Sequence, residues 1–191
     1  MVQIHFRPQN IPRKHQRMNE EILRNMAVIQ ERINNACKES NRNPDEVKLL
    51  LATKTVPVER IKIALQAGHT LIAENKVQEL KEKYEALKGV SHTNHFIGHL
   101  QTNKIKEVLK YDVSCIQSLD RIDLAEKLQQ RLEYEDKTID VLVQVNTSNE
   151  ESKFGVHPDN AIALVQQIAR LDRLKIKGLM TIGLFSAETE K

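Results

Sequence analysis

The stretch VKLLLATKTVPVERI, residues 47–61, joins an apolar run, a lysine and the start of a helix. Such a continuous apolar run is typical of a strand buried on both faces of a parallel sheet. Pro57 follows at a position where helices commonly begin. Lysine is rarely buried, because removing an ammonium from water is costly unless it is paired or loses its proton. Lys54 therefore either extends to water or serves as a neutral amine for chemistry.

The same pattern of strand followed by helix repeats outward from this stretch. Asp120 stands where an N-cap would begin one of the later helices. Repeated βα units of this length predict an α/β fold around a parallel sheet. The expected strands are 47–54, 70–74, 93–98, 113–119, 139–146 and 175–182, and the expected helices are 18–40, 57–67, 75–88, 101–110, 120–133 and 158–171.

Two architectures fit this alternation. An open doubly wound sheet usually has a glycine-rich turn after its first strand, and the turn here, TKTVPVE, contains no glycine. A (β/α)8 barrel needs eight βα units and is typically about 250 residues long. The sequence offers six strands and then ends in SAETEK, where a seventh unit would continue. We expect either an open sheet or a barrel that lacks two strands in this chain.

Composition restricts the class of protein. The chain has 191 residues and a formal net charge of +3, which gives no strong electrostatic reason to expect nucleic acid or a membrane as partner. Cys37 and Cys115 are too few for a disulfide framework and fit free thiols in a reducing compartment. We expect a cytoplasmic protein. The first seventeen residues contain four basic residues and no acid, and we expect residues 1–17 to be a disordered basic extension before a single domain at 18–191.

The ends of the predicted strands carry polar residues. Function in a barrel lies at the carboxyl ends of the strands, so these residues are the candidates for a site. Lys54 is the one plausible covalent nucleophile among them that is not a hydroxyl, and its neutral amine could attack an aldehyde and hold it as an imine. The seven histidines show no HxxxH or HxH spacing, so we expect no metal site.

Six longer motifs follow one another along the chain: LLLATKTVPVERI, AENKVQELKEKYEAL, HFIGHLQTNKIKEVL, IQSLDRIDLAEKL, VLVQVNTSNEESKFGV and IKGLMTIG. In this order they resemble the YggS/PROSC family of pyridoxal phosphate homeostasis proteins. The resemblance covers about residues 18–183 and implies a TIM-barrel-like (β/α)8 fold of the alanine racemase N-terminal type, with about six of the eight strands present in this chain. It also implies that Lys54 forms a Schiff base with pyridoxal 5'-phosphate (PLP).

The resemblance carries further positions over to the cofactor site: Asn75, His99, Met180 and Thr181. Ala73 stands where the family usually has glycine, and Lys76 stands where it commonly has tyrosine. Purely structural roles remain open for two of the strand-end residues. In these, His99 caps the helix that follows it, and Glu74 forms an ion pair with a neighbouring lysine. The family's phosphate-binding segments follow its seventh and eighth strands and do not occur in this sequence, so we expect this chain by itself to bind PLP weakly and to be poorly stable.

Three functions remain open at this point. The first is a monomeric PLP carrier that performs no amino-acid catalysis, has no catalytic residues, and passes the cofactor to apo PLP-dependent enzymes. The second is an amino-acid racemase of the same barrel, although racemisation needs proton donors and acceptors on both faces of the cofactor. Tyrosine often fills one such role, and the three tyrosines here lie in or beside predicted helices. The third, an RNA-interacting scaffold, depends only on the basic arm, and a salt-dependent gel shift would be needed to support it.

Overall fold

The strands of the protein form one parallel sheet. The computed structural model describes residues 13–150 and 152–183. The strands are hydrogen-bonded in the order in which they occur along the chain, and every neighbouring pair is parallel. They are β1 (Leu51–Ala52), β2 (Leu71–Glu74), β3 (Thr93–Phe96), β4 (Val113–Leu119), β5 (Ile139–Gln144) and β6 (Leu174–Met180).

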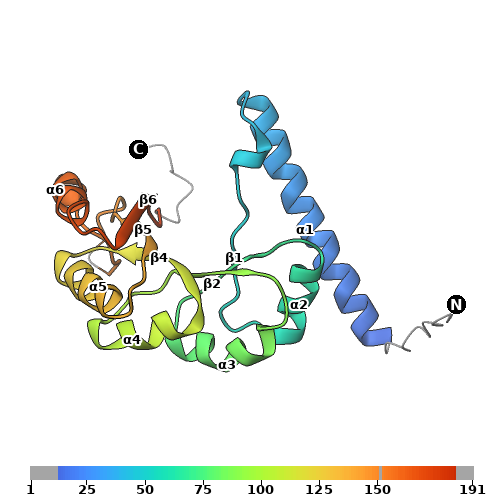
Figure 1. Ribbon diagram of the computed structural model, residues 1–191. Coiled ribbons are helices and arrows are strands. Elements are labelled where there is room, and N and C mark those ends of the chain that lie inside the picture. Colours follow the sequence, from blue (N-terminus) through green and yellow to red (C-terminus); the bar gives the residue numbers. More distant parts are fainter. Residues whose placement is uncertain (1–12, 151, 184–191) are drawn as a thin grey trace, which may run out of the picture.

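The strand order distinguishes between the two architectures. A doubly wound sheet reverses its order at a switch point, and no such reversal occurs from β1 to β6. Because parallel crossovers are right-handed, consecutive order places the connecting helices on one side of the sheet. Figure 1 shows them as an outer arc around the strands. The helices are α1 (Arg13–Glu39), α2 (Val58–Gln66), α3 (Val77–Leu87), α4 (Ile105–Val108), α5 (Ile122–Tyr134) and α6 (Pro158–Ile168), with 3-10 turns η1 (Pro44–Glu46), η2 (Thr102–Lys104) and η3 (Leu109–Tyr111).

The main hydrophobic core lies between the strands and this outer layer of helices. Alternate residues of β5, Ile139, Val141 and Val143, pack in one cluster with Leu128 of α5 and Ile168 of α6. A smaller cluster joins β2 to α2 and to the end of α3. Burying apolar area in this way is the dominant favourable term in folding. The barrel-type α/β fold predicted from the sequence is confirmed, with its core on the helix side of the sheet.

The opposite face of the sheet, here called the inner face, is more polar. Side chains at paired positions of parallel strands lie on the same face, so one row can be followed across all the strands. The row begins with two small side chains and becomes polar and charged from β3 onward. Its members are Ala52, Ala73, His95, Cys115, Asp140 and Lys175.

Several boundaries differ from the sequence prediction, most of all at the starts of β1, α1 and α4, where the expected helix 101–110 is divided into η2, α4 and η3. The apolar run 47–54 forms ladder pairs only at Leu51 and Ala52, which pair with Ile72 and Ala73 of the four-residue strand β2. Helix α1 begins at Arg13 rather than at residue 18, so the last part of the expected disordered extension is helical. Residues 1–12 of that extension lie outside the described residues.

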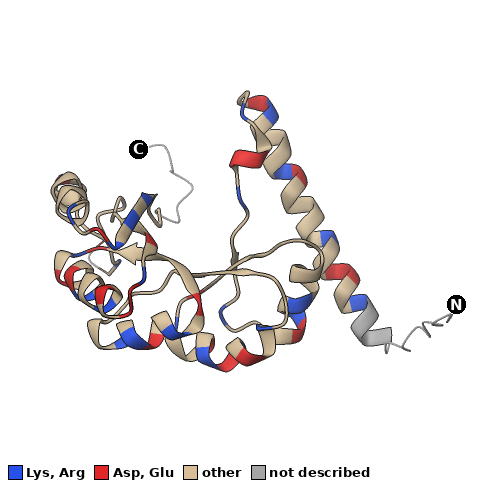
Figure 2. Ribbon diagram, in the orientation of Figure 1, with Lys and Arg blue, Asp and Glu red and all other residues tan. Residues whose placement is uncertain are grey.

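Charged residues of both signs alternate over the helices. Figure 2 shows Lys and Arg interspersed with Asp and Glu along α1 to α5. This distribution gives no single-sign field over the described helices that would attract nucleic acid. Among residues 13–150 and 152–183, no helix combines the length and apolar character that crossing a membrane requires.

Candidate functional site

The carboxyl ends of the parallel strands bring most of the predicted site residues to one edge of the sheet. Lys54 follows β1, Asn75 follows β2, and His99 lies beyond β3. Met180 ends β6, and Thr181 follows it. This edge is where α/β barrels carry their chemistry. The parallel topology alone therefore gathers residues that are far apart in the sequence.

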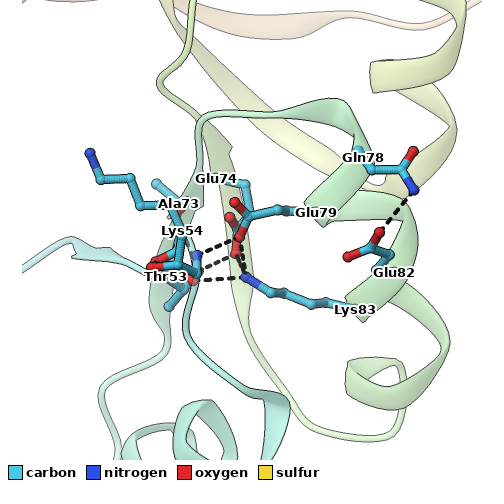
Figure 3. A network of polar contacts seen from close by, with 9 residues as sticks. Thr53, Lys54, Ala73, Glu74, Gln78, Glu79, Glu82 and Lys83 are labelled. Atoms are coloured by element: carbon cyan, nitrogen blue, oxygen red, sulfur yellow. Dashed lines mark hydrogen bonds and ion pairs between the residues drawn. The ribbon is translucent and has the colours of Figure 1, made fainter.

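Lys54 points to the inner face. Residues of an extended segment alternate between faces, and Leu51 and Thr53 contact the helix side, so Ala52 and Lys54 lie on the other side. Figure 3 shows the Lys54 side chain directed away from the polar contacts made by Thr53. The side chain is exposed. Within the described residues, no hydrogen bond or ion pair engages its ammonium, which leaves the nitrogen open to a ligand.

A buried network of charges surrounds the backbone on both sides of Lys54. Lys83 Nζ donates to Glu74 Oε1, to Glu79 Oε2 and to the backbone oxygen of Thr53, each at 2.7 Å. Thr53 Oγ1 donates to the same Glu74 oxygen at 2.6 Å, and the Thr55 amide donates to Glu79 Oε2 at 2.6 Å. Two acids and one base of β2 and α3 thus hold the residues before and after Lys54 (Figure 3).

The two carboxyl groups of this network differ in acidity. Burial raises the pKa of Glu74, despite its hydrogen bonds from Lys83 and Thr53. Burial alone would also raise the pKa of Glu79, but hydrogen bonds from Lys83 and from the Thr55 amide outweigh it and lower that pKa. The sequence left open that Glu74 forms a structural ion pair with a neighbouring lysine, and its pairing with Lys83 confirms this. The same contacts also reach the strand end that carries Lys54.

Asn75 and His99 line a pocket of about 230 Å³ between α3 and the η2–α4 segment. Lys54 is not among the residues that line it. The Asn75 Oδ1 atom is buried and has no hydrogen-bond partner among the described residues. The structure therefore brings Asn75 and His99 together but leaves Lys54 outside their pocket. The other lining residues are Lys76, Val77, Gln78, Phe96, Leu100, Gln101, Lys104 and Glu107.

The His99 ring does not cap the helix that follows it. It stacks on Phe154, with ring centroids 3.9 Å apart and 15° between the planes. Its Nδ1 lies 3.8 Å from Asp120 Oδ2. Asp120 was expected to cap the helix after it, but its carboxylate pairs with Arg121 Nη1 at 2.8 Å and α5 begins without a side-chain cap. The strong guanidinium contact replaces the cap.

The segment after β5 reaches across to β6. Lys153 Nζ pairs with Glu150 and donates to the Gly183 oxygen at 3.0 Å. Thr147 and Thr181 share a hydrogen bond of 2.7 Å between their hydroxyl groups. Thr181 is thereby held beside the end of β5, and Met180 precedes it at the end of β6. Both lie on the strand-end edge where the sequence placed them.

Glu79 and Lys83 were not expected at the site from the sequence. Glu79 and Lys83 are four residues apart on α3, a spacing that usually indicates an exposed ion pair on a helix surface. The signal that could have identified them is the combination of this pair with Glu74 at the end of a buried strand. A carboxylate at such a position needs a partner, and the next helix supplies one.

Comparison with known proteins identifies the family of this chain. The alanine racemase N-terminal domain matches residues 22–191. The pyridoxal phosphate homeostasis protein of Haemophilus influenzae is 42% identical over 163 residues, which are 84% of this chain and 68% of that protein. The chain belongs to the pyridoxal phosphate homeostasis family. This membership agrees with the consecutive parallel strand order and with the lysine at the end of β1.

Solved structures of similar proteins share the fold. A protein of unknown function from Bifidobacterium adolescentis superimposes with a TM-score of 0.84 at 38% identity, covering 90% of this chain and 73% of that one. PipY of Synechococcus elongatus, solved with PLP bound, superimposes with a TM-score of 0.68 at 28% identity, covering 84% and 73%. The alanine racemase type of barrel is therefore the fold of this family member.

Proposed function

We propose that this protein binds PLP through a Schiff base on Lys54 and acts as a reversible carrier of the cofactor. The observation that supports this most directly is the exposed amine of Lys54, which lies on the inner face at the strand-end edge and is unengaged among the described residues. The family name of the Haemophilus relative and the PLP bound to PipY agree with it.

The surroundings of Lys54 fit an aromatic aldehyde. The row below it on the inner face begins with two small side chains, Ala52, which is exposed, and Ala73, which is buried. PLP, when bound, supplies an aldehyde that accepts an amine. Lys54 would hold the cofactor through its amine, which would condense with that aldehyde with the loss of one water molecule. A second amine can take the place of Lys54 at that carbon, which returns Lys54 as a free amine and suits a carrier.

We propose that the other residues predicted for the cofactor site also contact PLP. Asn75 and His99 would approach the cofactor from the β2 and β3 ends, and Met180 and Thr181 from the β6 end. Thr181 shares its hydroxyl hydrogen bond with Thr147, so a hydroxyl pair is available at that end for a phosphate oxygen. Recipient apo enzymes would accept the cofactor after its release. We propose a monomer in a reducing cytoplasm, where the free thiols of Cys37 and Cys115 would be stable.

The alternative function, an amino-acid racemase, finds less support in the positions of the tyrosines. Tyr84 donates to Asp112 Oδ2 at 2.7 Å and packs edge-on against Tyr111, and Tyr134 is 81% exposed on α5. All three lie on the helix layer rather than on the strand-end edge of the described residues. A carrier needs no second proton-transfer group, which favours it over a racemase for this set of residues.

Visible absorption of the protein titrated with PLP tests the proposal. We expect a Schiff-base band that saturates with PLP in the wild-type chain and is lost in Lys54→Ala. Lys81→Ala, which removes an exposed lysine of α3, is the matched control and should keep the band. An equal band in Lys54→Ala would show that other lysines carry the aldehyde, and the proposal would then be wrong. Racemisation of alanine by the PLP-loaded protein would instead favour the enzyme.

A further inference from the structure

The backbone on either side of Lys54 is held by side chains from other elements. Before it, the Thr53 amide donates to the Ala73 oxygen at 2.9 Å, and the Thr53 oxygen accepts from Lys83. After it, the Thr55 amide donates to Glu79. Lys54 itself takes no part in these side-chain contacts. The network therefore constrains the position of its Cα and leaves its amine free.

Thr55 has an unusual backbone conformation. Its φ is +61°, in the left-handed region that β-branched residues rarely adopt. Such strain persists only where the surroundings hold it in place, and it is common at functional sites. The turn is closed by a hydrogen bond of 3.0 Å from the Val56 amide to the Thr53 oxygen, and the Thr55 amide adds a hydrogen bond to Glu79, which comes from another element. This turn ends the strand directly after Lys54 and sends the chain to α2.

Within this network the Lys83 ammonium is fully hydrogen-bonded, whereas Glu74 Oε2 is buried and has no hydrogen-bond partner among the described residues. Lys83 is 9% exposed and Glu74 is 2% exposed. The ammonium of Lys83 has three protons, and its three acceptors use all of them. A buried ion pair is weak support for stability by itself, since apolar residues of similar size often stabilise as well. What apolar residues cannot reproduce is the pair of hydrogen bonds to backbone atoms on both sides of Lys54.

We infer that Glu79 and Lys83 are positioning residues, which fix the strand end so that the Lys54 amine points to the inner face and meets the aldehyde in one orientation. The inference deepens the proposed function and rests on it. Groups held in a defined position react faster and bind more tightly than mobile ones, and a displacement of about 1 Å can cost about a hundredfold in rate.

Four variants of α3 test the inference, two in the network and two beside it. Glu79→Gln and Lys83→Met remove a charge from the network. Glu82→Gln and Lys81→Met make the same chemical changes at exposed positions, where Glu82 contacts only Gln78 among the described residues. We expect the network variants to weaken PLP binding per folded molecule at least about tenfold, and the controls to stay within about twofold. A purely structural role would lower the melting temperature and leave this affinity unchanged, which would overturn the inference.

Amide hydrogen exchange of the ligand-free protein separates this inference from the proposed function. The segment 53–56 should exchange faster in Glu79→Gln and Lys83→Met than in the wild type, and at the wild-type rate in the two controls. Unchanged exchange in the network variants would overturn the inference even if PLP binds to Lys54. Failure of the wild type to bind PLP would overturn the proposed function, and the exchange result would still decide whether these residues hold the strand end.

A rescue experiment tests whether Glu79 acts through its hydrogen bond from the Thr55 amide. Glycine adopts positive φ without a steric penalty, so Thr55→Gly should keep the turn without help from Glu79. We expect Thr55→Gly in the Glu79→Gln background to regain part of the lost affinity. If the double variant binds PLP no better than Glu79→Gln, then Glu79 does not act by holding Thr55, and that step of the inference is wrong.

Discussion

At the scale of single residues, Lys54 obtains its direction from its neighbours rather than from its own contacts. Thr53 on one side and Thr55 on the other are bound to β2 and α3, and the side chain of Lys54 between them is directed away from their polar contacts. The apolar strand that ends in a lysine drew attention to Lys54, and its role in binding the cofactor came from the family motifs and stays a prediction. The sequence was not sufficient to identify Lys83, because on a helix a lysine four residues after a glutamate usually lies at the surface.

The two glutamates of the network should respond to pH in opposite directions. The pKa of Glu74 is raised from an ordinary value of 4.5, so its stabilising contribution is present below that value and is lost as the pH rises through the raised pKa. The pKa of Glu79 is lowered, so its contribution is present above 4.5 and is lost as the pH falls through the lowered pKa. Urea unfolding of Glu74→Gln and Glu79→Gln between about pH 3 and pH 7 measures both contributions.

Glu79→Gln should lower the unfolding free energy most above pH 4.5. The difference in unfolding free energy from the wild type should become smaller as the pH falls. For Glu74→Gln, the unfolding free energy should increase relative to that of the wild type as the pH rises from 4.5 to 7. Glu82→Gln is the control and should show no such trend. Parallel pH profiles for the two network variants would contradict the assignment of a raised pKa to Glu74 and a lowered one to Glu79.

The thiol of Cys115 should be inert in the native protein. Burial raises its pKa to about 11, and the carboxylate of Asp140 beside it contributes in the same direction. At pH 8 roughly one molecule in a thousand would carry the reactive thiolate. Reaction with an aromatic disulfide, measured in a Cys37→Ala background, should be very slow until urea is added. Rapid stoichiometric reaction of the native protein would show that Cys115 is open to solvent.

At the scale of elements, the end of β3 and the end of β2 approach closely at one glycine. A Cβ on Gly98 would lie 1.9 Å from the Asn75 backbone oxygen. Gly98→Ala should therefore displace the β2 end and lower the free energy of unfolding by about 3 kcal/mol. Gly89→Ala is the control, since a Cβ there meets no atom within 4 Å. Equal unfolding free energies for the two variants in urea would contradict the close approach.

The sequence predicted the elements well where both pattern and pairing agreed. Strand β4 spans the predicted residues 113–119, because it has a strand on each side and an apolar face against the helices. The run before Lys54 is just as apolar, yet only Leu51 and Ala52 pair, because its neighbour β2 is four residues long and strand propensity alone does not reveal the length of the partner. Asp120 shows the same limit. A carboxylate that looks like an N-cap in the sequence binds the guanidinium of Arg121 instead.

At the scale of the whole molecule, the consecutive strand order is what relates the separate strand ends to one site. The alternation of strands and helices was compatible with an open sheet, and the six motifs and the observed order favour the barrel. The sequence could not predict which strand-end side chains meet. The stacking of His99 on Phe154 and the hydroxyl pair of Thr147 and Thr181 join residues from different loops, and these contacts depend on the paths that the loops take after the strands.

Borohydride reduction followed by peptide mass mapping tests the central claim most directly. The protein would be equilibrated with excess PLP, reduced and digested, and the modified lysines quantified in the wild type and in Lys54→Ala. The account predicts a dominant adduct on the peptide that contains Lys54, with no other lysine gaining a comparable adduct when Lys54 is replaced. An adduct spread evenly over exposed lysines such as Lys76 and Lys81, and unchanged in Lys54→Ala, would contradict it.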